Sequence, residues 1–433
     1  MTVDEAFARP DGPLLAVSPP LPLPMPLSLP MPLPGGLLLR ESRPEDLEQL
    51  GALLAERGDP ADALDHRLVV EDPDAGWSAS AVVVDGDRVV STATLLDEEL
   101  RLGDVRLPAG QVELVATDEE YEGRGLVRAL MRWAHARSAA RGHVVQVMIG
   151  IPYFYRLFGY EYAIDIPVSR PLRSTPPTEG GAPALRTARA TDLPALAALQ
   201  EQAQRGFDLA MGHAPARWRW LLAHDASTLR VVERAGEVVA VGRTTPVEGG
   251  EFHLAEAAAA DERAARELLA GVAALAPEAR LHVVHRPGTL PATVWHELLD
   301  RTPRPEAEQY YVRIPDPAVL LDRLRPLFHQ RLTAAGPDRA DGELLLTTYR
   351  AHYRVPIGAQ GPGEVVTGGT MQHLGASGGV GVAPDALAAL LFGPYGIEGL
   401  SRIRPDVYGR GDEELHRALF PPLTADLLTY YLP

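Results

Sequence analysis

A strand-like run, a glycine-rich turn and the start of a helix follow one another between Val112 and Arg128. The run Val112-Glu113-Leu114-Val115-Ala116-Thr117 precedes Glu122-Gly123-Arg124-Gly125-Leu126-Val127-Arg128. Glycines at a helix start let the backbone approach a ligand closely. The free N–H groups of the first turn, at the positive end of the helix dipole, bind phosphate. The pattern predicts a phosphate site, although such a glycine pair can also form an ordinary turn.

An aromatic cluster follows the next strand-like run. It reads Ile151-Pro152-Tyr153-Phe154-Tyr155-Arg156-Leu157-Phe158-Gly159-Tyr160. A phenol, with an ordinary pKa of about 10, can donate a proton to a leaving group and recover it from solvent. Aromatic rings here can instead pack a helix onto a sheet, and we predict that packing role for Tyr153, Phe154 and Phe158.

Regular elements must hold these two stretches in place. Apolar periodicity and turn residues predict strands at 38–40, 82–84, 89–90, 111–117 and 144–149, and helices at about 43–54 and 126–141. Asp85-Gly86-Asp87 between valine runs indicates a β-hairpin. This order of elements predicts an α/β (α+β) fold in which helices flank a mixed sheet.

The same order of residues returns after a linker at 171–183 that contains several Pro, Gly, Ser and Thr residues. The sequences Leu39-Arg40 and Arg43-Pro44-Glu45-Asp46-Leu47 correspond to Leu185-Arg186 and Arg189-Ala190-Thr191-Asp192-Leu193. The repeat predicts a second copy of the fold at 184–306, the second region. After Phe252-His253-Leu254 the chain continues directly into Ala255–Leu269 without a glycine loop. We therefore predict that the second region binds no cofactor.

Two further segments complete the chain. Residues 10–34 are dominated by Pro and Leu and lack the basic segment of a signal peptide, so we predict that 1–36 is a disordered or polyproline-II leader. The third region, 307–433, has a helical pattern at 319–332 that Pro326 must kink or break. Strand-like runs at 343–349 and 353–355 and a short apolar helix at 386–392 indicate an α+β domain.

Composition narrows the function. The 433-residue chain has no cysteine and a formal net charge of −17. The lack of cysteine excludes disulfides, thiolate metal sites and cysteine nucleophiles, and it is typical of the cytoplasm. We predict no bound metal. The negative charge argues against partners such as nucleic acid or anionic membrane, and it weakly favours cationic amines, although a soluble surface alone would also explain it.

The glycine turn and the aromatic cluster together resemble the GNAT superfamily of acetyl-CoA-dependent N-acetyltransferases, over a first region at 37–170. The family's pyrophosphate loop, Gln/Arg-x-x-Gly-x-Gly/Ala, becomes Glu122-Gly123-Arg124-Gly125-Leu126-Val127 here. The aromatic cluster resembles the family's Phe-Tyr-x-x-Phe-Gly-Phe/Tyr element. Glu122 and Val127 depart from the pattern. Because such loops bind mainly through backbone N–H groups, we expect weakened rather than lost binding, with Arg124 or Arg128 in compensation.

The resemblance implies acetyl-CoA as co-substrate. Its pyrophosphate is expected on the glycine loop and its pantetheine arm along the preceding strand. The residues expected to contact it are Val115, Ala116, Thr117, Gly123, Arg124, Gly125, Leu126, Val127, Arg128, Gly150 and Ile151.

The resemblance also implies catalytic roles. The family tyrosine that corresponds to Tyr155 often protonates the departing CoA thiolate. The attacking amine must lose a proton, so a base is useful. Glu113 lies two residues before Val115, which places both side chains on one face of a regular strand, although Glu113 can equally be a structural hydrogen-bond acceptor. Lesser candidates are Asp118, His135 and His143, the last just after a helix end, where caps are common.

The three-part layout resembles the enhanced-intracellular-survival (Eis) family, which joins tandem GNAT modules to a sterol-carrier-protein-like C-terminal domain. That family acetylates amines, including multi-amine antibiotics, and in some members the terminal carboxylate is the base, here on Pro433. The resemblance implies direct transfer to a primary amine of a small, cationic molecule. Transfer of another acyl group is one alternative. Another is a non-catalytic binding or regulatory protein with a relic GNAT module and an apolar-ligand-binding C-terminal domain. The acceptor and the oligomeric state, a homo-oligomer included, stay open.

Overall fold

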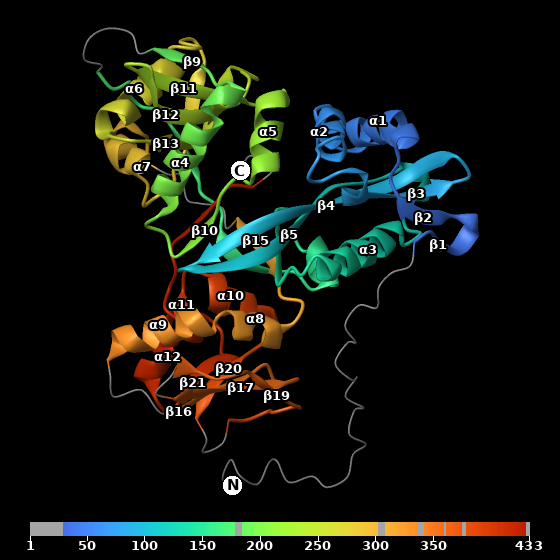
Figure 1. Cartoon of the computed structure of the whole chain (residues 1–433), viewed down its shortest axis with the longest axis vertical. Coiled ribbons are helices and arrows are strands. Elements are labelled where there is room, and N and C mark those ends of the chain that lie inside the picture. Colours follow the sequence, from blue (N-terminus) through green and yellow to red (C-terminus); the bar gives the residue numbers. More distant parts are fainter. Residues whose placement is uncertain are drawn as a thin grey trace, which may run out of the picture.

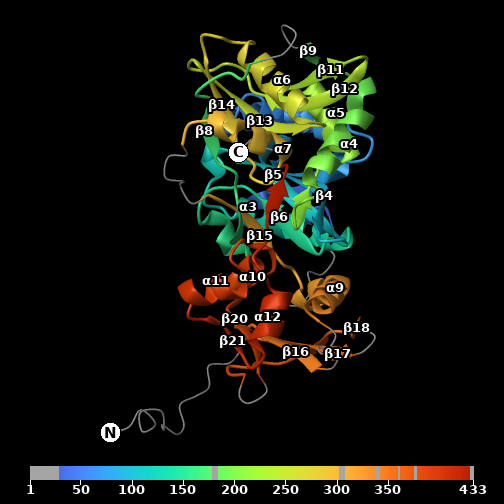
Figure 2. The ribbon, with the colours of Figure 1, turned by 90° about the vertical axis from the view of Figure 1, so that its left-hand side faces the viewer.

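The computed structural model describes residues 29–177, 184–301, 308–336, 342–358, 361–374 and 378–429. Three sheets with flanking helices make up this part of the chain (Figure 1). In the view turned by 90° the second region stands above the first, and the third region lies at the opposite end (Figure 2). No helix within the described ranges has the length and apolar character needed to cross a membrane.

The first region forms a sheet between two layers of helices. Its strands are β2 (Leu38–Glu41), β3 (Ser80–Asp85), β4 (Arg88–Leu102), β5 (Val105–Thr117), β6 (Val145–Met148) and β7 (Glu161–Asp165). Helices α1 (Leu47–Arg57) and α2 (Asp62–Val70) cover one face, and α3 (Leu126–Ala140) covers the other (Figure 1). Alternation explains the two cores: Val82 packs with Leu50 on the α1 side, whereas Val83 packs with Leu130 of α3. The strands and helices predicted here from the sequence are confirmed.

The second region repeats this local construction. Its sheet contains β9 (Leu185–Thr187), β11 (Thr228–Arg234), β12 (Glu237–Thr244), β13 (Glu251–Ala259) and β14 (Arg280–Val284). Its helices are α4 (Leu193–Gln204), α5 (Pro215–Ala223), α6 (Glu262–Ala273) and α7 (Leu290–Trp295). In the first region Arg40 donates two hydrogen bonds to Asp46, at 2.6 and 2.7 Å, and thereby ties the first strand to the first helix. Arg186 and Asp192 form the same pair of bonds at 2.7 and 3.0 Å.

The third region is an α+β unit. Its strands are β16 (Gly342–Thr347), β17 (His352–Gly358), β18 (Gly361–Pro362), β19 (Val366–Gly368), β20 (Gly379–Val382) and β21 (Val407–Arg410). Its helices are α8 (Pro317–Arg323), α9 (Arg325–Ala335), α10 (Leu387–Phe392), α11 (Gly396–Ile403) and α12 (Glu413–Leu419). The predicted helix at 319–332 is broken as expected, at Leu324, so that Pro326 falls in the first turn of α9, where its missing N–H costs nothing.

Strands cross the expected region boundaries. Strand β15 (Gln309–Arg313) lies between β6 and β7 in the first sheet, whereas β8 (Ser169–Pro171) joins the second sheet beside β14. Strand β10 (Leu209–Met211) pairs with both β4 and β22 (Ala425–Leu427). The boundaries near 170 and 306 therefore do not separate the sheets. Such pairing is set by distant parts of the chain, so local periodicity could not indicate it.

The expected leader also needs a correction at its end. Strand β1 (Met31–Pro32) pairs with β2, so the sheet begins before residue 37. Residues 1–28 lie outside the described ranges.

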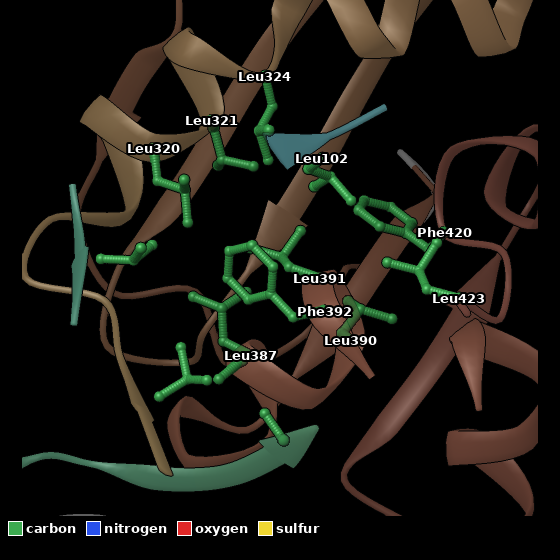
Figure 3. Packing of buried hydrophobic residues seen from close by; sticks show 14 of the residues in the cluster. Leu102, Leu320, Leu321, Leu324, Leu387, Leu390, Leu391, Phe392, Phe420 and Leu423 are labelled. Atoms are coloured by element: carbon green, nitrogen blue, oxygen red, sulfur yellow. The ribbon is translucent and has the colours of Figure 1, made fainter. Parts of the chain in front are cut away.

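The far end of β4 enters the core of the third region. Leu102 lies beside Phe420, in a cluster that also contains side chains from α8 and α10 (Figure 3). The labelled members are Leu320, Leu321, Leu324, Leu387, Leu390, Leu391, Phe392 and Leu423. The first and third regions therefore share one apolar core, which fixes the strands of the first region at one end.

Candidate active site

The turn between β5 and α3 leaves room for a ligand. Gly123 and Gly125 have φ of +74° and +79°, a conformation that favours glycine, and a Cβ on either would meet no atom within 4 Å. Gly125 is the N-cap of α3, and no side chain caps this helix. The first-turn N–H groups therefore face open space without a side-chain acceptor, as a phosphate site requires.

Leu126 is buried and Val127 is partly buried, so at these two positions the loop offers a ligand mainly its backbone. Leu126 is 4% exposed and packs in the core under α3, and Val127 packs partly against the same core. Val127 in place of a small residue therefore leaves the open face of the loop unchanged.

The two arginines expected to compensate for Glu122 are engaged with aromatic rings. Arg124 lies 4.4 Å from the centre of the Tyr121 ring and donates a hydrogen bond of 2.9 Å to the Glu120 carbonyl. Arg128 lies 5.8 Å from the centre of the Phe158 ring. Neither contact brings the guanidinium to Glu122.

Arg57 at the end of α1 forms an ion pair with Glu122 instead. The pair joins positions 65 residues apart, so no local pattern could indicate it. Glu122, which replaces the Gln or Arg of the family loop, is thus paired with a cation, Arg57.

An opening separates β5 from β6 beside the loop. The two strands pair in parallel only at Ala109↔Val145 and Gly110↔Gln146. Beyond Gly110 the two strands diverge, and β6 continues to pair with β15 on its other side. Among the described residues, the β6-facing edge of β5 from 111 to 117 has no strand partner. An extended chain such as a pantetheine arm can use these backbone groups.

A β-bulge changes which side chains face the opening. Leu114 has φ +51°, and the register with β4 shifts at this point. Leu114 and Ala116 pack in the core under α1 and α2, whereas Val115 packs toward α3. Charged groups of the α2 and α5 side act on Glu113. The prediction that Glu113 and Val115 share a face is therefore wrong, because the bulge breaks the alternation on which it depended.

Glu113 is a buried carboxyl group. It is 3% exposed and accepts a hydrogen bond of 2.6 Å from the Gln111 amide. Burial raises the pKa of Glu113 to about 8, with a smaller contribution from Glu98, while Arg217 and the Gln111 bond oppose the rise. A carboxylate whose pKa lies near the working pH is suited to accept a proton.

Tyr155 lies on a short 3₁₀ turn, Phe154–Phe158, after β6. Gly150 makes its position possible, because a Cβ there would come within 2.4 Å of the Tyr155 ring. Burial, and then the charge of Glu113, raise the pKa of Tyr155 to about 12, so the phenol keeps its proton at neutral pH. The charge of Glu113 acts on Tyr155, but the two side chains lie in different layers: Tyr155 packs in the core under α3, whereas the charged groups that act on Glu113 belong to the α2 and α5 side.

The neighbouring aromatics fill different roles. Phe154 and Phe158 lie edge to face with ring centres 5.6 Å apart and pack partly on the core, as predicted. Tyr153 is 65% exposed, so its predicted packing role is wrong. Its φ of +68° turns it outward, and its N–H donates to the Tyr162 hydroxyl at 2.8 Å. Ile151, expected at the cofactor, is also exposed.

Sequence reasoning missed Tyr311, which supports this turn from β15. Its hydroxyl donates a hydrogen bond of 3.1 Å to the Ile151 carbonyl and lies 2.6 Å from the Tyr162 hydroxyl. The Tyr311 and Tyr155 rings lie edge to face, 6.0 Å apart. Tyr311 lies on β15, which pairs with β6 and β7 although it is far along the chain. No signal in the sequence near the aromatic cluster indicates it.

The remaining candidate residues are buried or form hydrogen bonds within the protein. Burial lowers the pKa of His135 to about 3. Asp118 accepts the N–H of the following turn, and Thr117 bonds to a serine hydroxyl of β4 at 2.7 Å. His143 lies between Ser138, at 3.2 Å, and an aspartate, at 3.0 Å. Pro433, the other base candidate, lies outside the described residues.

A cavity of about 170 Å³ lies between the first and second regions. Its charged lining residues are Asp72, Asp74, Asp97, Glu98, Arg137 and Arg217. Arg217 of α5 forms a buried ion pair with Glu98 of β4 and acts electrostatically on Glu113, so this wall of the cavity adjoins the candidate base. All four acids are ion-paired within the protein: Asp72 and Asp74 with Arg219, Asp97 with Arg141, and Glu98 with Arg217.

Comparisons with known proteins identify the domain type and the fold that this chain resembles. Residues 59–163 match the acetyltransferase (GNAT) domain family. A GCN5-related N-acetyltransferase from Anabaena variabilis has a similar structure, with TM-score 0.65 and 16% identity over 90% of this chain and 99% of that one. A GCN5-related N-acetyltransferase from Kribbella flavida gives a TM-score of 0.62 and 21% identity over 91% of this chain and 98% of that one. Eis1 from Mycobacterium abscessus gives a TM-score of 0.59 and 18% identity over 91% of this chain and 100% of that one. No curated protein sequence matches the chain.

Residues 59–163 of the first region therefore match the acetyltransferase (GNAT) domain model, and the predicted mixed α/β GNAT fold is confirmed. The likeness to the solved structures extends over about nine-tenths of the chain and concerns the fold.

Proposed function

We propose that the chain is an N-acetyltransferase that moves the acetyl group of acetyl-CoA directly to a primary amine of a small, cationic molecule. One observation carries the proposal: the open, uncapped glycine turn lies beside the free edge of β5, the strand that carries the buried Glu113 carboxyl group, and the neighbouring strand β6 leads into the turn that carries the Tyr155 phenol. A relic domain has no need to keep these three features together. The proposal includes a small-molecule partner rather than nucleic acid or membrane.

The residues present fit the co-substrate. The space above Gly123 and Gly125 would be filled by any side chain, and the free edge of β5 adjoins it. When bound, acetyl-CoA supplies a thioester, which is the activated acyl group. Gly123–Arg128 would hold its pyrophosphate, and Val115–Thr117 its pantetheine arm.

Tyr155 and Glu113 divide the proton transfers. A new N–C bond forms as the C–S bond breaks, and the Tyr155 hydroxyl gives its proton to the leaving sulfur. The proton that the amine nitrogen loses goes to the Glu113 carboxylate. Transfer between these groups or through solvent then restores both residues. The raised pKa values suit the roles, because Tyr155 stays protonated while Glu113 titrates near neutrality.

The cavity between the first and second regions supplies the acceptor site. A cationic amine would enter between α2 and α5 and reach Glu113 past the Glu98–Arg217 pair. The second region would then serve as a wall of the acceptor site, and the third as a sterol-carrier-like domain. Because strands cross between all three regions, we expect them to fold as one unit.

The terminal carboxylate on Pro433 is a second proposed base. Support comes from the preceding strand: Asp426 of β22 is ion-paired with Arg286 at 2.7 Å, which anchors this segment in the second region. Appending a few residues after Pro433 separates the two bases. Unchanged turnover in the extended protein would exclude the terminal carboxylate and leave Glu113.

The test is a panel of primary amines with acetyl-CoA, followed by thiol release. We expect turnover with at least one multiply charged amine and none in Gly125→Glu. Thermal stabilisation by acetyl-CoA without turnover on any amine would favour the binding-protein alternative. Turnover only with a longer acyl-CoA would correct the acyl group.

A further inference from the structure

The ion pair between Arg57 and Glu122 stands at the edge of the glycine loop. Glu122 directly precedes Gly123, and Arg57 is the last residue of α1. The Arg57 side chain is 31% exposed and that of Glu122 is 54% exposed, so solvent, and therefore a ligand, reaches both. The pair crosses from the α1 layer to the start of α3.

A purely local role does not explain this contact. A cation in the last turn of α1 favours the negative end of that helix dipole wherever its head group points. Here the guanidinium instead reaches the residue whose family counterpart, Gln or Arg, contacts phosphate. Glu122 takes one Nη of Arg57, while a guanidinium carries five N–H donors in a planar fork. The remaining edge can bind a phosphate oxygen with two charge-assisted bonds.

We propose that Arg57 is a cofactor-binding residue that contacts the pyrophosphate of acetyl-CoA, and that Glu122 positions it. This inference rests on the proposed function. In this proposal Arg57 of α1 makes the phosphate contact that the Gln or Arg of the usual loop would make. The Glu122 carboxylate holds the Arg57 guanidinium in place through their ion pair. Arg124 and Arg128 are held against the Tyr121 and Phe158 rings, which leaves Arg57 as the arginine in contact with Glu122.

A double-mutant cycle tests the assignment through acetyl-CoA affinity, measured by calorimetry. Arg57→Ala alone should weaken binding, but mere loss of charge neutralisation at Glu122 would do the same. The double variant Arg57→Ala/Glu122→Gln separates the two roles. If Arg57 binds phosphate, the double variant stays about 10–100-fold weaker than Glu122→Gln, as expected for lost bonds to a charged group. Equal affinity of those two variants would overturn the proposal.

A neighbouring pair provides the matched control. Arg67 and Glu48 form an exposed ion pair at 3.3 Å between α2 and α1, and neither borders the loop. The cycle of Arg67→Ala and Glu48→Gln should leave acetyl-CoA affinity unchanged. A loss in that cycle similar to the loss at Arg57 would reduce the effect to general surface charge and overturn the assignment.

The choice of phosphate is tested with dephospho-CoA, which lacks the 3′-phosphate but keeps the pyrophosphate. Arg57→Ala should weaken binding of both compounds by the same factor. A loss confined to acetyl-CoA would move Arg57 to the 3′-phosphate and refute the pyrophosphate contact. If the wild-type protein binds neither compound, the proposed function fails along with this inference, whereas wild-type binding with a neutral cycle refutes this inference alone.

Discussion

The first and second regions begin alike and diverge at one connection. In both, an arginine on the first strand holds the aspartate at the first helix with two hydrogen bonds. From the central strand to the next helix, the first region uses residues 118–125 and the second only 260–261. Helix α3 has Gly125 as its N-cap and, among the described residues, no side-chain cap, whereas Asp261 caps α6 and accepts the Ala264 N–H at 2.7 Å.

The cap distinguishes the helix start in the second region from the one for which we propose a phosphate site. An aspartate at the N-cap occupies an N–H group of the first turn and places a negative charge where a phosphate would lie. The helix dipole in the second region is thus satisfied from within the protein. In the first region it is left to a ligand.

The gap beside the central strand shows the same contrast. In the first region the parallel pairing stops after Gly110, whereas β13 and β14 pair from Glu251 to Leu254. Beyond this pairing Arg286 donates to the Ala255 carbonyl at 3.4 Å, and a cavity of only about 30 Å³ remains. Protein groups therefore fill the place that the first region leaves open. The second region still contributes α5, which forms a wall of the cavity between the first and second regions.

Gly125→Glu should give the largest effect, because it places in the first region the carboxylate that already closes the second. The substitution strains a residue with φ +79° and projects negative charge into the open phosphate site. We expect acetyl-CoA binding to fall below detection in calorimetry. Unchanged affinity would refute the cofactor assignment.

Gly236→Glu is the matched control. Gly236 also has a positive φ, +85°, and open space around it, but it lies in a hairpin of the second region. This variant should bind one acetyl-CoA per chain with wild-type affinity. A stoichiometry of two in either the wild type or this variant would show that the second region has kept its site.

Tyr155→Phe should lower turnover by about 10²–10⁴-fold and leave acetyl-CoA affinity nearly unchanged. The hydroxyl acts on charge that develops only during the reaction, and general acid catalysis contributes on this scale. The ring and its packing are kept. Steady-state kinetics with any accepted amine, together with calorimetry, gives both quantities.

Tyr160→Phe removes a neighbouring buried hydroxyl as a control. That hydroxyl donates a hydrogen bond of 2.5 Å to the Gln146 side chain and has no assigned part in the proposed chemistry. We expect a stability loss of about 1 kcal/mol with normal turnover. Wild-type turnover in Tyr155→Phe, or an equal loss in both variants, would leave Tyr155 with a packing role only.

Glu113→Gln should lower turnover by about 10²-fold and flatten its pH dependence. With a pKa of about 8, Glu113 gains its basic form as the pH rises, so wild-type turnover should increase through that range. A pH–rate profile of both proteins makes the comparison. A variant that keeps the wild-type profile would place the base elsewhere, for example on Pro433.

The same variant gives a stability test that needs no substrate. The folded-state pKa of Glu113 is raised, so its stabilising contribution is present below the unfolded pKa of about 4.5 and is lost as the pH rises toward 8. Glu113→Gln should therefore gain stability relative to wild type over that range, by a few kcal/mol at most. A constant difference between the two melting curves from pH 5 to 8 would show that the carboxyl group is not buried as described.

Local signals predicted most of the first region, because its strands and helices have clear periodicity and its turns carry Gly or Asp. The repeat was also visible, since Arg40 and Asp46 recur as Arg186 and Asp192. Long-range pairing was not visible. Tyr311 reaches the site on an exchanged strand, and Arg57 finds Glu122 across 65 residues. The β-bulge at Leu114 was missed for another reason: a bulge depends on the partner strand as much as on the sequence of the bulged strand.

Asp261→Ala should have the smallest effect and tests whether the cap or the connection decides the difference between the regions. The variant removes the side-chain acceptor of the Ala264 N–H, which typically costs about 1 kcal/mol of stability. Urea unfolding measures that loss. We expect no second acetyl-CoA site, because 260–261 contains no glycine and Arg286 still occupies the gap beside β13. If calorimetry instead shows two acetyl-CoA molecules per chain, the Asp261 carboxylate alone prevents the second region from binding acetyl-CoA. If only stability falls, the short connection and the filled gap are what separate the two copies.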